Sequence, residues 1–232
     1  MPSLPPAIEL AVHRSGDGPP LVALHDLGQT GESMIDALDV LSSEFRIIAP
    51  DLRGHGGSPT PHGPWSIDDF ASDVARLVAA EGGGAILVGV GLGAATGLAL
   101  ALGHPGLVEG LVVSGIGPRG EDTEGQDRWA RAARALRERR GREGVALSAE
   151  AMGTRPDWRG ALAQVDAPVI VLAGSPDRAV PAEMQRELSV WIQNARFHVV
   201  SEAGHNVAVE KPNELIRAVR SLALRSHQPV AA

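Results

Sequence analysis

The sequence predicts an α/β fold with a mostly parallel β-sheet that carries helices on both faces. Short apolar runs recur along the chain, and most of them are followed by a helical pattern. Alternation of this kind produces a parallel sheet covered by helices. The chain has 232 residues, 44% of them hydrophobic, which is sufficient for one domain with a sizeable core.

The individual elements follow from the apolar and helical patterns. We expect parallel strands at residues 20–25, 46–51, 85–89, 108–114, 168–174 and 195–201. We expect helices at residues 31–41, 66–80, 92–102, 182–193 and 213–224. Ser66 followed by Asp69 resembles a capping box, which indicates where the second of these helices begins. Residues 7–14 are expected to add an antiparallel strand at the edge of the sheet.

Residues 118–160 interrupt the alternation, because they are polar, rich in Arg and Glu, and helical without a strand signal. An interruption of this kind in a regular sheet predicts an inserted cap. The expected organisation is therefore a core formed by residues 1–117 and 161–232, with a short helical cap at 118–160. Acidic residues interleave with the arginines of this segment, which favours a solvated helix face over a nucleic-acid surface.

Composition excludes several classes of function. The formal net charge of −7 argues against binding to nucleic acid or to an anionic membrane. The absence of cysteine excludes disulfides and thiolate chemistry. Met1–Pro6 lacks the features of a signal peptide, and the apolar run 85–102 is punctuated by glycines, so we expect a cytoplasmic protein without a membrane span. A small-molecule substrate is the expected partner, and a homodimer is left open.

Residues that follow the strands carry the candidate chemistry, because open parallel sheets bind ligands beyond the carboxyl ends of their strands. In chain order these segments read HDLG at 25–28, DLRGHGGS at 51–58, GVGLG at 89–93, GSPD at 174–177 and AGHN at 203–206. The series resembles the landmarks of the α/β-hydrolase fold over nearly the whole chain. The motif D-x-R-G-x-G-x-S is matched in full, and HDLG stands where that family has H-G-x-G. The resemblance implies that His205 is the catalytic histidine and Asp177 its orienting acid.

The departure from the family lies at the nucleophile elbow, G-x-S-x-G, where this chain has Gly91 in place of the serine. Glycine adopts the strained turn easily, so we expect the turn to persist without a side chain able to form a covalent ester. By the same resemblance, the backbone N–H groups of Leu27 and Leu92 are expected to form an oxyanion hole.

Other residues near these strand ends are candidates for the substrate pocket. Asp26 either provides a second acid or base or turns outward. His25 is expected to pack beneath the oxyanion loop. Ser114 is expected to end its strand for turn reasons, and replacement of the nucleophile by Ser114 is the alternative. His55 and His62 are expected at the surface, and Asp51 and Arg53 are expected to form an ion pair. The full set of pocket candidates is His25, Asp26, Val90, Ser114, Trp129 and Trp158.

A dinucleotide-binding interpretation also has to be weighed, because Gly89, Gly91 and Ala94 match G-x-G-x-x-G/A between a strand and a helix. The following strand, however, ends in Ser-Gly without the carboxylate that would hold a ribose. The histidines carry no metal-ligand spacing, so neither a metal nor an organic cofactor is expected.

Three hypotheses about function remain. In the first, the protein is an enzyme that works without a covalent serine intermediate on a small apolar carbonyl substrate. His205, oriented by Asp177, acts as its general base. The reaction is either hydrolysis by direct attack of water or lyase, isomerase or cyclase chemistry by proton abstraction. In the second, the chain is a non-catalytic relative that binds a ligand. In the third, it is an inactive variant of a serine hydrolase whose nucleophile was replaced by Gly91.

Overall fold

The computed structural model describes residues 8–226, and its central sheet has the order β1-β3-β2-β4-β5-β6-β7. All neighbouring strands are parallel except β1, which pairs antiparallel with β3 at one edge. The strands are β1 (Val12–Ser15), β2 (Pro20–Leu24), β3 (Arg46–Pro50), β4 (Ala85–Val90), β5 (Val108–Ser114), β6 (Val169–Gly174) and β7 (Ala195–Val200). The α/β prediction and the antiparallel edge strand are confirmed, although residues 1–7 lie outside the described part.

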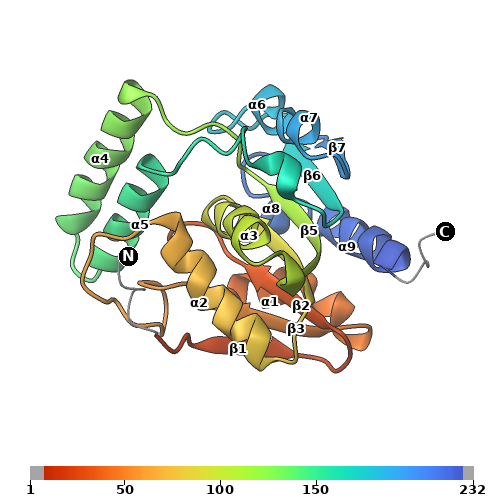
Figure 1. Ribbon diagram of the computed structural model, residues 1–232. Helices are drawn as coiled ribbons and strands as arrows, with labels where there is room; N and C mark the ends of the chain where they lie inside the picture. The colour runs from red at the N-terminus through yellow and green to blue at the C-terminus, as the bar shows by residue number, and fades with distance from the viewer. Residues whose placement is uncertain (1–7, 227–232) are drawn as a thin grey trace.

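Helices cover both faces of this sheet (Figure 1). They are α1 (Gly31–Leu38), α2 (Ile67–Ala80), α3 (Leu92–Gly103), α4 (Thr123–Arg137), α5 (Glu143–Gly153), α6 (Ala182–Arg186), α7 (Leu188–Trp191), α8 (Val207–Glu210) and α9 (Pro212–Ser226). Short 3₁₀ turns occur at Asp39–Ser43, Pro105–Leu107 and Leu162–Gln164. The predicted helix at 182–193 is divided into α6 and α7, and the capping box formed by Ser66 and Asp69 begins α2 as expected.

Two apolar clusters, one on each face of the sheet, hold the layers together. On one face α2 and α3 pack on the central strands, and on the other face α1 and α9 do so. Helix α3 is apolar on all sides and buried from Leu92 to Ala101, which is expected of a helix enclosed between a sheet and its neighbours. This burial fixes the N-terminus of α3 at the carboxyl end of β4, where the candidate site lies.

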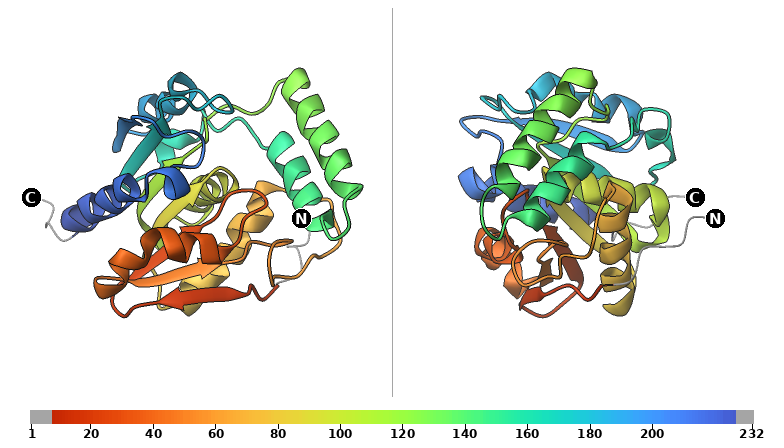
Figure 2. Two further views of the ribbon diagram at one scale, coloured as in Figure 1. Left: turned by 180° about the vertical axis from the view of Figure 1, so that it is seen from behind. Right: turned by 90° about the vertical axis from the view of Figure 1, so that its left-hand side faces the viewer.

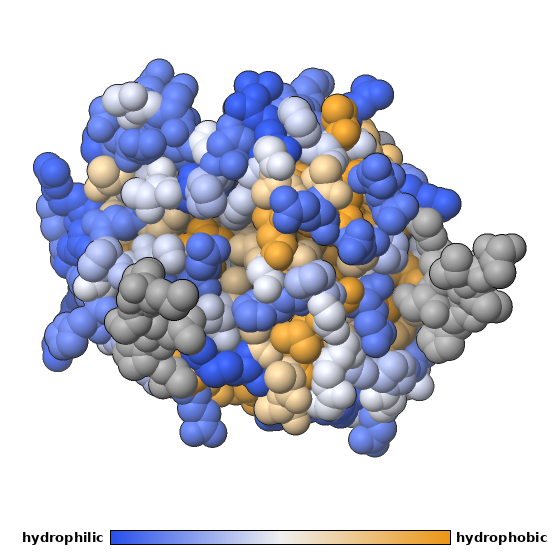
Figure 3. All heavy atoms as spheres, in the orientation of Figure 1, coloured by the Kyte–Doolittle hydropathy of each residue, from blue (hydrophilic) through white to orange (hydrophobic). Residues whose placement is uncertain are grey.

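Helices α4 and α5 lie between β5 and β6 in the chain and pack side by side, apart from the layers of the sheet (Figures 1 and 2). Residues 118–160, all of which the structure describes, contain no strand. Most of α4 is exposed, and its outer surface is hydrophilic in Figure 3. The interleaved Arg and Glu residues therefore form a solvated face, as the sequence predicts.

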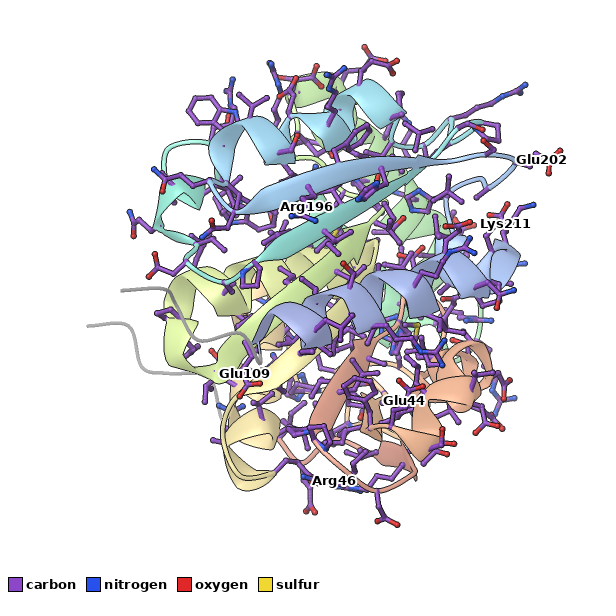
Figure 4. The ribbon with its side chains drawn as sticks, turned by 90° about the vertical axis from the view of Figure 1, so that its right-hand side faces the viewer. Glu44, Arg46, Glu109, Arg196, Glu202 and Lys211 are labelled. Atoms are coloured by element: carbon purple, nitrogen blue, oxygen red, sulfur yellow. The ribbon has the colours of Figure 1, made fainter. Side chains whose placement is uncertain are left out.

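The other edge of the sheet is β7, which carries alternate exposed side chains such as Arg196 (Figure 4). Beyond its end, Glu202 and Lys211 project outward together and form an exposed ion pair of 3.2 Å. The chain then returns through residues 203–206 toward the carboxyl ends of the strands. In the described part of the chain, no helix is long and apolar enough to span a bilayer.

Candidate active site

Gly91 forms the turn between β4 and α3, with φ +51° and ψ −110°. A side chain rarely adopts this conformation, whereas glycine does so at little cost. The N–H of Gly91 donates to the carbonyl oxygen of Ser114 on β5, which holds the turn against the neighbouring strand. The sharp turn therefore persists without a serine.

His205 and Asp177 come together from the loops after β7 and β6. His205 Nδ1 lies 3.0 Å from Asp177 Oδ2, which fixes the ring with Nε2 free to face the site. The other carboxylate oxygen of Asp177 accepts the N–H groups of Ala179 and Val180 at 2.8 and 3.0 Å. Asp177 is thus bound as an acceptor on both oxygens and orients the imidazole.

Gln185 supports this pair, although nothing in the sequence pattern identifies it. Its side-chain NH₂ donates to Asp177 Oδ2 at 3.1 Å, and its carbonyl oxygen accepts the N–H of Gly115 at 2.8 Å. Gly115 in turn has φ +71°, and an added Cβ would lie 2.8 Å from the His205 ring. Gln185 is fully buried on α6, and only the structure reveals this burial.

The two backbone N–H groups predicted to form an oxyanion hole do converge, but on a side chain of the protein itself. Leu27 N–H and Leu92 N–H both donate to Asp26 Oδ1, at 2.7 and 3.1 Å. The expectation of an open anion site is therefore wrong for this state of the chain. The cause is that Asp26 turns inward, one of the two orientations that the sequence left open.

Asp26 occupies the space that a nucleophile at position 91 would need. A Cβ built on Gly91 would overlap Asp26 Oδ1, so Gly91 and Asp26 fit together only because residue 91 has no side chain. The second oxygen, Asp26 Oδ2, lies 3.5 Å from His205 Nε2. The site is consequently a row of three groups, Asp177, His205 and Asp26, with a carboxylate at each end.

Burial raises the pKa of the Asp26 carboxyl above its ordinary value. The charge of His205 and the two N–H donors act in the opposite direction without cancelling the effect of burial. The Asp26 carboxyl therefore binds a proton more readily than an exposed aspartate does.

Two buried histidines hold the loop that carries Asp26. His25 Nδ1–H donates to the carbonyl oxygen of Asp26 at 2.7 Å, and its Nε2 accepts Leu52 N–H at 2.9 Å. His55 Nε2 likewise accepts Gly28 N–H at 3.0 Å. Burial lowers the pKa of His25 to about 4 and lowers that of His55, so both rings are neutral. The expectation that His55 lies at the surface is wrong, because its ring is buried. It packs inward to accept the N–H of Gly28, at the end of the segment HDLG.

Several of the predicted pocket residues do not line the cavity at the site. His25, Val90 and Trp158 are buried within the fold, where Val90 and Trp158 belong to the apolar clusters. Ser114 ends β5 with its hydroxyl buried and unpartnered within the described structure, and it too lies outside the cavity lining. His25, Val90 and Ser114 lie at strand ends that face the core beneath a turn, and Trp158 packs into an apolar cluster from the segment after α5.

The predicted ion pair between Asp51 and Arg53 is also wrong. Arg53 is buried and pairs with Asp73 on α2 at 2.6 Å. Asp51 instead accepts the N–H groups of Gly31 and Gly57 at 2.7 and 2.8 Å. Both residues hold their loop in place, but through partners that the spacing of D-x-R-G does not indicate.

Within residues 8–226, no group of three His, Asp or Glu side chains is placed to hold a metal ion.

A cavity of about 490 Å³ opens between the site and the pair α4–α5. Asp26, Gly91 and His205 form its floor, and Trp129 and Ala132 of α4, with Met152 of α5, contribute to its walls. Of the pocket candidates, Asp26 and Trp129 lie in the lining of this cavity. Charged groups are also present in the lining, namely Glu121, Arg128, Arg155 and Arg178.

Comparison with known proteins agrees with this architecture. The chain is 28% identical to the 2-hydroxy-6-oxo-2,4-heptadienoate hydrolase of Pseudomonas putida, over 91% of each chain. It is 29% identical to a 2-hydroxymuconate semialdehyde hydrolase of a Pseudomonas species, over 88% of this chain and 86% of that one. Among solved structures, a malate-bound esterase from Thermogutta terrifontis superposes with a TM-score of 0.88, at 27% identity and over 95% of each chain.

A model of the alpha/beta hydrolase family matches residues 21–219, which is most of the chain. The matched region includes every strand from β2 onward, the turn at Gly91, and both Asp177 and His205. The seven-stranded, mostly parallel sheet and the helices on its two faces have the architecture of these relatives. The chain therefore belongs to the alpha/beta hydrolase family and is a hydrolase-like enzyme.

Proposed function

We propose that this enzyme hydrolyses a small molecule without a serine ester intermediate, with His205 as the general base that takes a proton from water. The observation that carries the proposal is the row formed by Asp177, His205 and Asp26 at the floor of a cavity, beside a turn that has no hydroxyl group. Asp177 stabilises the imidazolium that forms when His205 Nε2 accepts the proton.

The substrate is proposed to be small and largely apolar, because aliphatic and aromatic side chains supply much of the cavity wall. We propose that residues 118–160 act as a cap over the core formed by 1–117 and 161–232, since α4 and α5 close one side of this cavity. The substrate would then enter between the cap and the carboxyl ends of the strands. The proposed reaction uses no cofactor.

A carbonyl substrate was expected from the sequence, with its oxygen bound by the N–H groups of Leu27 and Leu92. Asp26 Oδ1 already accepts both of these bonds, so a substrate oxygen would have to displace a carboxylate from two donors. The proposal is accordingly framed on the activation of water by His205, which does not depend on a free oxyanion hole.

The fit between Gly91 and Asp26 argues against an inactivated serine hydrolase. A serine at position 91 would overlap Asp26 Oδ1 in this conformation, so an elbow with a serine requires the Asp26 side chain to move. The non-catalytic alternative accounts for the cavity itself, but it gives no reason for the approach of His205 Nε2 to a second carboxylate.

The experiment compares wild type with His205→Gln and Asp177→Asn on a panel of small esters, lactones and alkyl bromides, with proton release as the readout. General-base catalysis contributes roughly 10²- to 10⁴-fold, so His205→Gln is expected to lose turnover by a factor in this range. His198→Gln, on the exposed face of the edge strand β7, is the matched control and should retain wild-type rates. Undiminished turnover by His205→Gln would contradict the proposal, and cavity binding without turnover by any variant would favour a ligand-binding protein.

The homodimer and the cytoplasmic location remain predictions of the sequence. Light scattering on the purified protein checks the first, and cell fractionation checks the second.

A further inference from the structure

We propose that Asp26 is the nucleophile of this enzyme, and that it attacks a saturated carbon atom carrying a leaving group. The inference deepens the proposed function, since it uses His205 as the base to water and identifies what that water attacks. The carboxylate would be presented from the loop after β2 in place of the missing side chain after β4.

The two oxygens of Asp26 have different surroundings, which divides their roles. Oδ1 is held by the N–H groups of Leu27 and Leu92, and it overlaps the position of a side chain on Gly91. Oδ2 accepts no N–H group from residues 8–226, and it faces His205 Nε2 across 3.5 Å. The Asp26 side chain is 16% exposed and belongs to the cavity lining, so Oδ2 is the oxygen available to a bound molecule.

The direction of the two N–H donors indicates the class of substrate. Donors of this kind act where negative charge develops, and here they point at an oxygen of the enzyme itself. Attack on a carbonyl would place a new oxyanion on the substrate, where neither N–H group is free to bind it. Attack on a saturated carbon creates no oxyanion, because the leaving group carries the charge away. When the ester formed on Asp26 is then hydrolysed, negative charge develops on Asp26 Oδ1, between the two N–H donors.

The chemistry balances over two steps. In the first, an electron pair of Asp26 Oδ2 forms a bond to the substrate carbon, and the leaving group departs with the electrons of the bond that breaks. In the second, His205 Nε2 takes a proton from water as the water oxygen attacks Asp26 Cγ, and the tetrahedral intermediate carries its charge on Oδ1. Collapse expels the alkoxide, which takes the proton back from His205. The products are an alcohol and the anion of the leaving group. The Asp26 carboxyl keeps one oxygen from water and loses its remaining proton to solvent, which regenerates the carboxylate.

His205→Gln provides the trap, because it keeps Asp26 and removes the base that the second step needs. The full-length variant is incubated with a series of n-alkyl bromides from ethyl to hexyl, and peptides are examined by mass spectrometry. The expected result is a gain of one alkyl group on the peptide that contains Asp26, at a level about tenfold or more above wild type, where the ester turns over. His205→Gln with Asp26→Asn is the matched control and should show no such gain. Asn keeps an oxygen for the two N–H donors but is a poor nucleophile.

A second measurement places the oxygen of water. Wild-type enzyme is allowed many turnovers of an accepted bromide in oxygen-18 water, and the expected result is label in the Asp26 carboxyl. In a single turnover with enzyme in excess, the alcohol should carry unlabelled oxygen, which comes from Asp26.

The outcomes separate the two proposals. Absence of an alkyl adduct on Asp26 with every member of the series overturns the inference, as does an adduct that persists when Asp26 is replaced by Asn. If the alcohol of the first turnover carries the label and His205→Gln is inactive, water attacks the substrate directly: the inference fails and the proposed function stands. If His205→Gln turns over as fast as wild type, the proposed function itself fails.

Discussion

Asp26 and Gly91 are sterically complementary: the carboxylate of one fills the space that any side chain at the other would occupy. The two residues belong to the loops after β2 and β4, and the N–H of Leu92, the residue after Gly91, donates to Asp26 Oδ1 at 3.1 Å. A serine hydrolase needs the opposite arrangement, a side chain after β4 and open space after β2. The histidine and its partner keep their places, whereas a carboxylate from the end of β2 occupies the space of a side chain after β4.

Replacing Gly91 by serine is expected to destabilise the protein and to leave it without esterase activity. The left-handed φ and the overlap with Asp26 together are expected to cost roughly 2–4 kcal/mol in the free energy of unfolding. Adding Asp26→Gly should recover the part of that loss that comes from the overlap, and the double variant should react with a serine-directed phosphonate. Denaturant unfolding and phosphonate labelling of the single and double variants check this coupling. Labelling of Gly91→Ser alone at the rate of the double variant would show that the two residues are independent.

Asp26→Asn is expected to raise the melting temperature at neutral pH. Burial raises the pKa of Asp26, so the folded protein binds more protons than the unfolded chain above the ordinary value of 3.8. The free energy of unfolding contributed by this group therefore falls as the pH rises through its folded pKa, and replacement by Asn removes the loss. Calorimetry of wild type and Asp26→Asn across the pH range should show a difference in melting temperature. This difference should grow as the pH rises above 3.8, the ordinary pKa of an aspartate, and should vanish below that pH. The exposed Glu202→Gln serves as control, and a constant difference would contradict the expectation.

His25 is expected to make the fold sensitive to acid. Its folded pKa is lowered to about 4 from 6.5, so between these values the unfolded chain binds a proton that the native ring does not. Stability is fully present above pH 6.5 and falls by up to roughly 3 kcal/mol as the pH drops through this window. Urea midpoints as a function of pH check the slope. His25→Asn should be less stable at neutral pH but show a flatter profile, whereas the exposed His62→Gln should follow wild type.

Gln185→Leu tests the role of the buried glutamine as a positioning residue. The substitution leaves the N–H of Gly115 without its partner and removes one donor from Asp177, at an expected cost of about 1–3 kcal/mol. We expect kcat to fall by about tenfold while KM changes little, because His205 loses orientation without contact between residue 185 and substrate. Gln185→Glu restores the acceptor for the N–H of Gly115 but places a second carboxylate beside Asp177. If Gln185 positions Asp177, the free energy of unfolding of Gln185→Glu should therefore recover only in part from that of Gln185→Leu. Full recovery would indicate a purely packing role.

The fold and half of the candidate site were predictable from the sequence, because they depend on local patterns. Apolar runs of five to seven residues fix the strands, and the order of strand-end motifs places Asp177, His205 and Gly91 at one edge of the sheet. The orientation of Asp26 was not predictable, since it depends on space left by Gly91 and on an N–H group 66 positions away in the chain. The burial of His55 and the role of Gln185 likewise arise from tertiary contacts that leave no periodic signal.

The same complementarity constrains the history of the site, if an ancestor carried serine at position 91 and glycine at position 26. Aspartate introduced first would have collided with the serine, whereas glycine introduced first opens the space that aspartate later fills. The accessible route therefore passes through a form with glycine at both positions, in which neither reactive oxygen is present. Reconstructed intermediates with glycine at both positions should be stable and nearly inert, because they carry neither a serine hydroxyl nor the Asp26 carboxylate.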